Sequence, residues 1–319
     1  MPFQLSPEIC PICQRKSKFK YIQDWQSKDG QFSLYECFCC QAQFWQPFKS
    51  PGRNWYENYD DKGNKERISF SKETFASFQE TAYGRAWYTE HLFKNFLFQK
   101  PKGKKLLDVG CGTGGFLSEA KKLGYEVYGV DFDENEASFI RENLDIKNVF
   151  AEDVFEFLKN KQGFFDVITG FEILEHLDKP KEFLELLYQA LKPEGYLILS
   201  MPNRERFFGK ITEWWDFPLE HLSRWNIKSL ENIVNMAGFK VIKIKENELF
   251  EYFIEKLNRL GDLFLKTREA KIRYKKEEAN IASRIWFQKN TIIDIFLNLP
   301  RLNKFRGLGL IIFAQKIKK

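Results

Sequence analysis

The sequence predicts an α/β fold in which a seven-stranded, doubly wound and mostly parallel sheet follows a small cysteine-rich ribbon. From Lys104 onward, short apolar segments alternate with amphipathic segments of helical period, which is the pattern of strands joined by helices. A glycine-rich turn at 110–115 separates the first such strand from the first helix. Two Cys-x-x-Cys pairs lie within the first forty residues. We therefore expect a main domain with a small domain in front of it.

The composition indicates one main globular domain with appendages. With 319 residues, 43% of them apolar, the chain is long enough to bury a sizeable core. The amino terminus lacks a basic segment followed by an apolar run, and charges interrupt the long apolar stretches. We therefore expect a soluble, cytoplasmic protein without a signal peptide or membrane span. A net charge of +6 is modest for this length and does not by itself indicate nucleic-acid binding.

Four cysteines of the amino-terminal segment have the spacing of a tetrahedral zinc site. Cys10 and Cys13 form one Cys-x-x-Cys pair, and Cys37 and Cys40 form the other. Each pair on a tight turn presents two thiolates, and two such turns complete a four-sulfur Zn²⁺ site. Four protein ligands leave no open coordination position, so this metal is expected to be structural. Cys39 does not give the required spacing and is left over. The alternative for these thiols is a redox pair or free buried cysteines.

The zinc ribbon is assigned to residues 1–48, and residues 49–98 to a linker and amino-terminal helices. Between the cysteine pairs, 21–37 predicts two strands around a Lys-Asp-Gly turn. The segment 43–64 is rich in aromatic residues, Pro and Gly and is interpreted as a linker that packs on the next domain. From 71 to 98, apolar residues at helical spacing predict a helix.

The main domain is assigned to residues 99–246, with its last strand at 307–319. Apolar runs bounded by turn residues predict the strands, and amphipathic runs that end near Gly or Pro predict the helices. The expected strands are 105–110, 126–131, 148–153, 165–170, 196–203, 239–247 and 307–318. The expected helices are 114–124, 134–144, 154–161, 180–195 and 227–239.

The turn after the first strand of this domain has the features of a ligand-binding loop. Its glycines, in the order Gly-x-Gly-x-Gly within 110–115, allow the backbone to approach a ligand closely. The spacing differs from the dinucleotide fingerprint, and no phosphate-loop Lys is present. Asp131 ends the second strand, where a carboxylate can accept both hydroxyls of a ribose, and Asp153 ends the third.

Five motifs in consecutive order resemble the class I S-adenosylmethionine-dependent methyltransferases. They are LLDVGCGTGGFL, VYGVDFDE, AEDVFEF, FDVITGFEILEHL and LKPEGYLILSMPN. The resemblance covers roughly 96–246 together with the last strand. It implies a seven-stranded sheet whose final strand is antiparallel, and S-adenosyl-L-methionine as the cofactor.

The resemblance also implies roles for residues at the strand ends. The loop glycines match those under the methionine part of the cofactor, and Asp131 matches the acid that holds the ribose. Asp153 and Val154 match the pair at the adenine, and Asp108 matches the acid that orients the loop and the cofactor's amino group. For Cys111, the alternative is a small side chain that only fills space. The candidate cofactor-binding residues are Asp108, Gly110, Cys111, Gly112, Gly114, Asp131, Phe132, Asp153, Val154 and Phe171.

A polar cluster follows the fourth strand directly. In FEILEHL, a helical turn would place Glu172, Glu175 and His176 on one side. His221 follows the fifth strand and opens over the same edge of the sheet. Two carboxylates and imidazoles can bind a divalent cation.

This pattern resembles the metal-dependent oxygen methyltransferases of small-RNA 3′ ends and of ubiquinone synthesis. The resemblance implies that Glu172, Glu175, His176 and His221 bind Mg²⁺ or Mn²⁺, and that the metal activates a substrate hydroxyl. Two alternatives remain open. His176 or His221 acts as a general base without metal, or these side chains only position the substrate.

The acceptor is expected to be a small molecule, a lipid-linked compound or a glycan, methylated on oxygen or carbon. The segment after the fifth strand, which contains Arg204, Trp214, His221 and Arg224, is interpreted as a lid over the acceptor. The alternatives are an RNA methyltransferase and a non-catalytic cofactor-binding protein.

Residues 247–306 are assigned to a helical insertion before the last strand. From 247 to 306 there are thirteen Lys and Arg against eight Asp and Glu, a surplus of five. Such basic amphipathic segments can contact an anionic membrane surface. The alternatives are a helical hairpin that closes the pocket and a homodimer interface.

Overall fold

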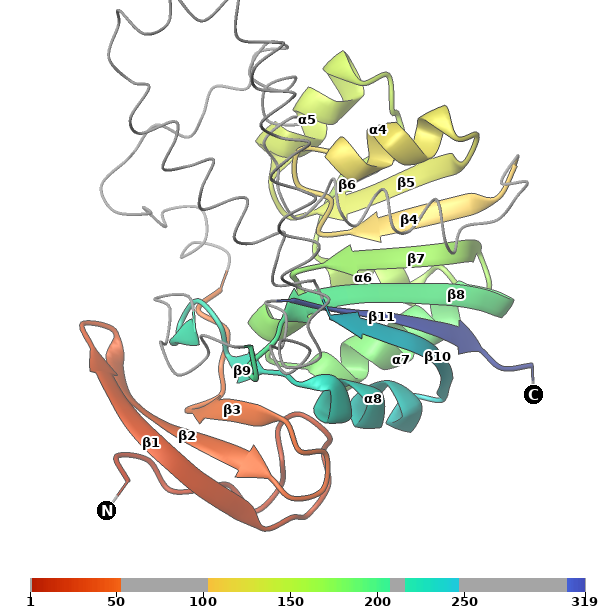
Figure 1. The fold of residues 1–319 in the computed structure, drawn as a ribbon. Coiled ribbons are helices and arrows are strands. Elements are labelled where there is room, and N and C mark those ends of the chain that lie inside the picture. The colour runs from red at the N-terminus through yellow and green to blue at the C-terminus, as the bar shows by residue number, and fades with distance from the viewer. Residues whose placement is uncertain (1, 53–102, 207–215, 247–308, 319) are drawn as a thin grey trace, which may run out of the picture.

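The computed structural model describes residues 2–52, 103–206, 216–246 and 309–318 and contains two sheets (Figure 1). The predicted amino-terminal helix at 71–98 and the helical insertion at 247–306 lie outside the described residues, as does part of the lid. None of the described helices has the length and hydropathy that crossing a membrane requires.

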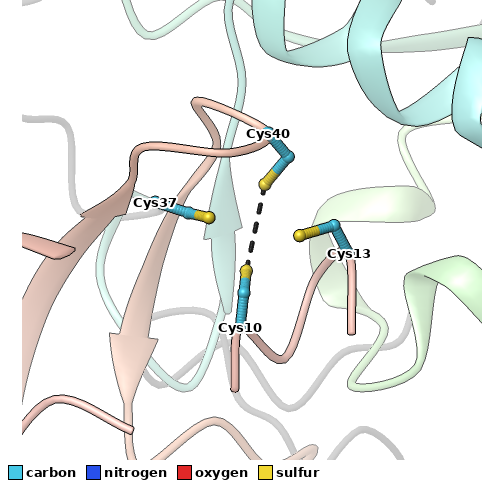
Figure 2. A group of neighbouring side chains, drawn as sticks. All are labelled: Cys10, Cys13, Cys37 and Cys40. Carbon is cyan, nitrogen blue, oxygen red and sulfur yellow. Dashed lines mark hydrogen bonds between the residues drawn. The ribbon is translucent and has the colours of Figure 1, made fainter. Parts of the chain in front are cut away.

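The amino-terminal ribbon is a small antiparallel sheet closed at one end by four cysteines (Figures 1 and 2). Its first two strands are paired around the predicted turn, with Ser27 opposite Gly30. The third strand, β3, lies in the segment that the sequence analysis assigned to a linker. That assignment is wrong for these four residues, because they pair with β2 on one side and β9 on the other. The strands are β1 (Phe19–Ser27), β2 (Gly30–Cys37), β3 (Gln43–Gln46) and β9 (Ser223–Arg224).

The second sheet has seven strands in the order β10-β11-β8-β7-β4-β5-β6. β4, β5, β6, β7 and β8 are parallel, as the strand and helix alternation predicts, and β11 inserts antiparallel between β8 and β10, as the family resemblance implies. The strands are β4 (Lys105–Val109), β5 (Glu126–Asp131), β6 (Val149–Ala151), β7 (Phe165–Phe171), β8 (Leu191–Pro202), β10 (Phe239–Glu246) and β11 (Gly309–Lys316).

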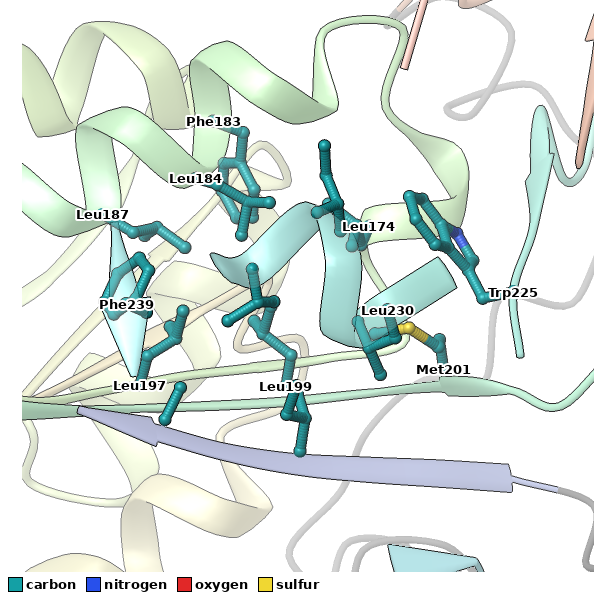
Figure 3. Packing of buried hydrophobic residues seen from close by; sticks show 14 of the residues in the cluster. Leu174, Phe183, Leu184, Leu187, Leu197, Leu199, Met201, Trp225, Leu230 and Phe239 are labelled. Atoms are coloured by element: carbon teal, nitrogen blue, oxygen red, sulfur yellow. The ribbon is translucent and has the colours of Figure 1, made fainter. Parts of the chain in front are cut away.

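Helices cover both faces of this sheet, and each face has its own apolar cluster. One cluster contains buried residues of α6, α7 and α8, which pack on strands such as β8 and β10 (Figure 3). The other contains buried residues of α4 and α5. The helices are α4 (Gly115–Lys122), α5 (Glu134–Asn143), α6 (Val154–Lys159), α7 (Pro180–Ala190) and α8 (Ile227–Met236), with a short 3₁₀ turn, η1 (Leu174–His176).

Helix α7 ends at Ala190, several residues before the end of the segment that was expected to be helical. Leu191 is already extended and pairs with Phe165 of β7. Pro193 lies two residues further, and proline disfavours the helical conformation in the residue before it. The strand β8 therefore includes the Pro-Glu-Gly segment that was expected to close the helix.

The ribbon is bound to the main domain by a strand and by side-chain contacts. Through β9, a segment of the main domain becomes the fourth strand of the ribbon sheet. The backbone N–H of Trp45 donates to the carbonyl of Leu222 at 3.0 Å, and its indole N–H donates to the carbonyl of Asp216 at 3.1 Å. Asn232 of α8 donates to the carbonyl of Cys40 at 3.3 Å. The ribbon is consequently packed against the segment of the main domain that follows β8.

Candidate functional site

The four cysteines of the ribbon converge on a common centre (Figure 2). The thiols of Cys10, Cys13, Cys37 and Cys40 all lie within 4.8 Å of one another, and all four residues are buried. The Sγ atoms of Cys10 and Cys40 are 3.9 Å apart, so they are not joined as a disulfide. Cys39 is only partly buried and is not in the group.

The two cysteine turns have the same backbone geometry. In the first, the N–H of Gln14 donates to the carbonyl of Cys10 at 2.8 Å, and in the second that of Gln41 donates to Cys37 at 2.8 Å. Both glutamines have a positive φ, 56° and 62°. The turns thus place each pair of thiols on the same side, and this arrangement suits a tetrahedral metal ion.

The glycine loop connects the ends of β4 and β5. The N–H of Gly110 donates to the carbonyl of Val130 at 2.8 Å, and the N–H of Gly112 donates to Oδ2 of Asp131 at 2.9 Å. Oδ1 of Asp131 accepts the N–H of Asp133 at 3.2 Å. A carboxylate can accept about four hydrogen bonds, so Asp131 retains lone pairs for a ligand. Burial raises the pKa of Asp131 despite these N–H donors.

Gly114 and its neighbour Gly115 give a matched pair of variants. Gly114 has a φ of 75°, and a Cβ there would lie 2.7 Å from Cγ1 of Ile140. Gly114→Ala is expected to lower the free energy of unfolding by about 1–3 kcal/mol. A Cβ at Gly115, in the first turn of α4, meets nothing within 4 Å, so Gly115→Ala is expected to be neutral or to stabilise by up to about 1 kcal/mol. Urea denaturation of both variants tests this, and equal losses of stability would contradict it.

The remaining candidate residues around this loop lie in different settings. Asp108 is buried and accepts a hydrogen bond from the hydroxyl of Thr169 at 2.7 Å. The side chain of Asp153 caps α6, whose first residue is Val154, by accepting the N–H of Phe155 at 2.8 Å. This carboxylate therefore has a structural role whether or not it meets an adenine.

Among the other three candidates, one is exposed and two are packed. Phe132 directly follows β5 and is 38% exposed. Phe171 at the end of β7 packs edge-on against Phe116 of α4, with ring centroids 4.9 Å apart. Cys111 is buried with its Sγ beside Gly129, where an added Cβ would lie 2.8 Å away. Its position fits the interpretation as a space-filling side chain.

At the adjacent strand end, Glu175, His176 and His221 form a compact cluster. Their candidate ligand atoms all lie within 4.8 Å of one another. Nε2 of His176 and Nε2 of His221 are each 4.0 Å from Oε1 of Glu175, and the two imidazole rings are perpendicular with centroids 4.8 Å apart. Glu175 is buried, and neither of its carboxylate oxygens accepts a hydrogen bond from a described residue.

A backbone carbonyl determines the tautomer of His176. Its Nδ1 lies 2.7 Å from the carbonyl oxygen of Glu220. A carbonyl can only accept, so Nδ1 carries the proton and Nε2 presents a lone pair toward Glu175. Such a hydrogen bond is the usual support of a metal-binding histidine.

Glu172 lies beside this cluster but outside the group of three. It has a φ of 54° directly before η1, and its Oε1 accepts the hydroxyl of Ser200 of β8 at 2.8 Å. The sequence analysis expected one helical turn across this segment. The structure instead has Glu172 in the left-handed conformation, followed by the short 3₁₀ turn η1. The structure brings Glu175, His176 and His221 together and holds Glu172 toward β8.

Burial disfavours charge on every member of the cluster. It raises the pKa of Glu175 well above its usual value, and the nearby charge of Glu172 adds to this. Burial lowers the pKa of His176 to about 4. It also lowers that of His221 well below its usual value, with smaller contributions from His176, Arg206 and Arg224. Neutral imidazoles beside a buried carboxylate that accepts no hydrogen bond from a described residue are a donor set that suits a cation.

The comparisons with known proteins agree with this geometry. Residues 81–244 match the family described as "Methyltransferase domain". The chain belongs to this family. It is a class I methyltransferase of the kind that uses S-adenosylmethionine, with the seven-stranded sheet described above.

The relatives of this methyltransferase cover only part of it. A ubiquinone biosynthesis O-methyltransferase of Nitrosococcus oceani is 32% identical over 160 residues, which are 44% of this chain and 66% of the relative. That of Pseudomonas aeruginosa is 37% identical over 110 residues, 32% of this chain and 46% of the relative. The chain thus spans about half to two thirds of the length of these curated relatives.

Solved structures show the same fold at lower identity. A SAM-dependent methyltransferase from Archaeoglobus fulgidus has a TM-score of 0.50 at 23% identity and covers 76% of this chain and 99% of its own. A phosphoethanolamine N-methyltransferase of Haemonchus contortus, in complex with S-adenosyl-L-methionine, has a TM-score of 0.54 at 16% identity and covers 93% and 71%.

In this methyltransferase, the ribbon contacts the backbone next to the Glu–His cluster, which the sequence did not indicate. The carbonyl of Leu222 accepts the N–H of Trp45, and the N–H of Leu222 donates to the carbonyl of Glu175 at 2.9 Å. Leu222 thus joins strand β3 of the ribbon to η1, one residue after His221. The only signal in the sequence was the apolar, aromatic character of 43–46, which is also compatible with a linker.

Proposed function

We propose that the protein transfers the methyl group of S-adenosyl-L-methionine to an oxygen of a hydroxyl-bearing small molecule. The observation that carries this proposal is the cluster of Glu175, His176 and His221 at the same sheet edge as the glycine loop. Parallel strands of an open α/β sheet place their ligands at their carboxyl ends. A group that handles a proton or a cation therefore lies next to the cofactor loop, as oxygen methylation requires.

On the cofactor side, the loop and Asp131 are proposed to hold S-adenosyl-L-methionine. The positive φ of Gly110, Gly112 and Gly114 turns the backbone sharply between β4 and α4, and the absence of a Cβ at these positions allows a ligand to approach the loop closely. Asp131 is fixed by two backbone N–H groups and offers its remaining lone pairs to the ribose hydroxyls.

Asp131→Ala is expected to weaken S-adenosyl-L-methionine binding by at least about tenfold, because charge-assisted hydrogen bonds are lost. Asp133 is the matched control, since it lies two residues further and caps α5 by accepting the N–H of Asn135 at 2.8 Å. Asp133→Ala should cost about 1 kcal/mol of stability and leave the affinity unchanged. Calorimetric titration with the cofactor measures both, and equal affinities of wild type and Asp131→Ala would refute the ribose assignment.

On the acceptor side, Glu175, His176 and His221 are proposed to bind a divalent cation. The carboxylate without donors and the lone pair of His176 directed at it support this proposal. One carboxylate and two imidazoles favour Mn²⁺ over Mg²⁺, which prefers oxygen ligands. When bound, such a cation lowers the pKa of a substrate hydroxyl. The protein's own part is to hold His176 through Glu220, to hold His221 through the β3–β9 pairing, and to exclude water from Glu175.

In the ribbon, Cys10, Cys13, Cys37 and Cys40 are proposed to bind a structural Zn²⁺. The support is the convergence of four buried thiols on two turns of identical hydrogen bonding. Four protein ligands leave no open coordination position for a substrate at this site. Its proposed contribution to function is to fold the ribbon that holds β9.

The curated relatives support a small-molecule oxygen acceptor, because their names state ubiquinone biosynthesis and O-methylation. The test is transfer of labelled methyl from S-adenosyl-L-methionine to panels of hydroxylated aromatic, polyprenylated and glycan compounds, with Mn²⁺ and after its removal. Product on an oxygen that requires Mn²⁺ supports the whole proposal. Turnover that is unchanged by metal removal would support methyl transfer but contradict the proposed cation. Product on nitrogen alone would contradict the proposed oxygen acceptor.

A further inference from the structure

A partly open recess lies on the ribbon side of the Glu–His cluster. Its enclosed space is about 10 Å³, which has room for about one water molecule or one ligand oxygen, and the rest opens to solvent. Arg204, Asp216, His221 and Arg224 are among its lining residues. His221 therefore lines the recess and also belongs to the cluster. A molecule bound in the recess would contact the cluster through His221.

Two arginines and one carboxylate are among the residues that line this recess. Arg206 donates to both oxygens of Asp216, and Nη2 of Arg204 lies 3.1 Å from Oε2 of Glu36. Nε of Arg224 is 3.8 Å from Oδ1 of Asp216, which is too long for a hydrogen bond. Asp216 is thus shared by two guanidinium groups, and Glu36 is paired with the third.

Two of the guanidinium donors make no hydrogen bond to the part of the chain that the structure describes. Nη1 of Arg204 and Nε of Arg224 are buried and donate to no described residue. Both side chains are only 9% exposed, and burial lowers the pKa of both. The carboxylates of Glu36 and Glu205 both favour the charged form of Arg204, and Glu205 also accepts a hydrogen bond from Asn226 at 2.5 Å. Tying the ribbon to the main domain explains the contact of Arg204 with Glu36, but it leaves these two donors unexplained.

We propose that the recess binds an anionic oxygen group of the acceptor, a carboxylate or a phosphate that lies close to the hydroxyl to be methylated. Guanidinium donors in a fixed fork match both groups. The position of His221 makes the acceptor, rather than the cofactor, the molecule that the anion belongs to. This inference rests on the proposed methyl transfer, and it narrows the substrate class to hydroxyl compounds that carry an anion.

The test is anion binding by the full-length, zinc-loaded protein, measured by calorimetry with inorganic phosphate and with acetate at constant ionic strength. Wild type is expected to bind one of the two, and Arg224→Gln is expected to weaken that binding by about tenfold or more. Arg224→Lys should retain part of the affinity because it keeps the charge. Arg141→Gln is the matched control, because Arg141 lies on α5 and donates to the carbonyl of Val149. The anion affinity of this variant should equal that of the wild-type protein.

Binding of S-adenosylhomocysteine is measured on the same samples. All four proteins should bind it equally, which shows that each variant is folded. Stronger binding of acetate assigns the recess to a carboxylate, and stronger binding of phosphate assigns it to a phosphate. Equal affinity of wild type and Arg224→Gln for both anions would overturn the proposal. Failure of the wild-type protein to bind S-adenosylhomocysteine would instead contradict the proposed function. The anion titrations would still decide whether the recess binds an anion.

Discussion

Glu175→Gln is expected to lower methyl transfer by about 100-fold or more while leaving the protein folded and its affinity for S-adenosylhomocysteine unchanged. The carboxylate is buried against two imidazoles and accepts no hydrogen bond from a described residue. Its charge is therefore unfavourable for the isolated fold, and an uncharged amide of equal size should maintain or raise the free energy of unfolding. Loss of activity without loss of stability is the expected signature.

Glu185→Gln is the matched control for this variant. Glu185 lies on the surface of α7 and is paired with Lys181 at 2.5 Å, so its loss should change stability by less than about 1 kcal/mol and leave turnover intact. Turnover and urea denaturation are measured on both variants. Mn²⁺ binding, followed by electron paramagnetic resonance, separates the two chemical roles. Loss of Mn²⁺ binding in Glu175→Gln supports Glu175 as a metal ligand. If that variant instead kept half of the wild-type turnover, Glu175 would be dispensable.

Cys40→Ser is expected to remove the ribbon metal and, through it, to impair the distant Glu–His cluster. Structural zinc contributes on the order of 10 kcal/mol to folding of such small sites, so the ribbon should lose its strands. β9 then loses its partner β3, and the hydrogen bond from Trp45 to Leu222 is broken. Since His221 directly precedes Leu222, displacement by about 1 Å could lower turnover on the order of 100-fold.

Cys39→Ser provides the control one residue away. Cys39 is partly buried and lies outside the group of four thiols, so this variant should keep about one zinc per chain, its thermal stability and its turnover. Metal content is measured by mass spectrometry together with turnover and limited proteolysis of the ribbon. Full turnover in Cys40→Ser after loss of zinc would show that the ribbon does not position His221.

Much of the fold could be predicted because local patterns determine it. The strand and helix alternation and the turn between β1 and β2 agree with these patterns, whereas the antiparallel last strand was implied only by the family resemblance. Gly110 and Asp131 were recognised from their positions at strand ends, and parallel strands bring such positions to one edge regardless of the side chains between them. The helix end at Ala190 was misjudged because an amphipathic pattern continues into the first residues of β8.

By itself, the sequence determined the class of fold, the methyltransferase motifs and the two groups of residues that gather at the cysteine turns and at Glu175. These depend on spacing along the chain, which folding preserves. The tertiary structure alone decided that β3 pairs with β9 and that Glu172 accepts a hydrogen bond from Ser200. It also decided that one buried donor each of Arg204 and Arg224 has no partner among the described residues. Those features arise from contacts between segments far apart in sequence. Burial determines which of these groups are charged, and burial cannot be derived from spacing along the chain.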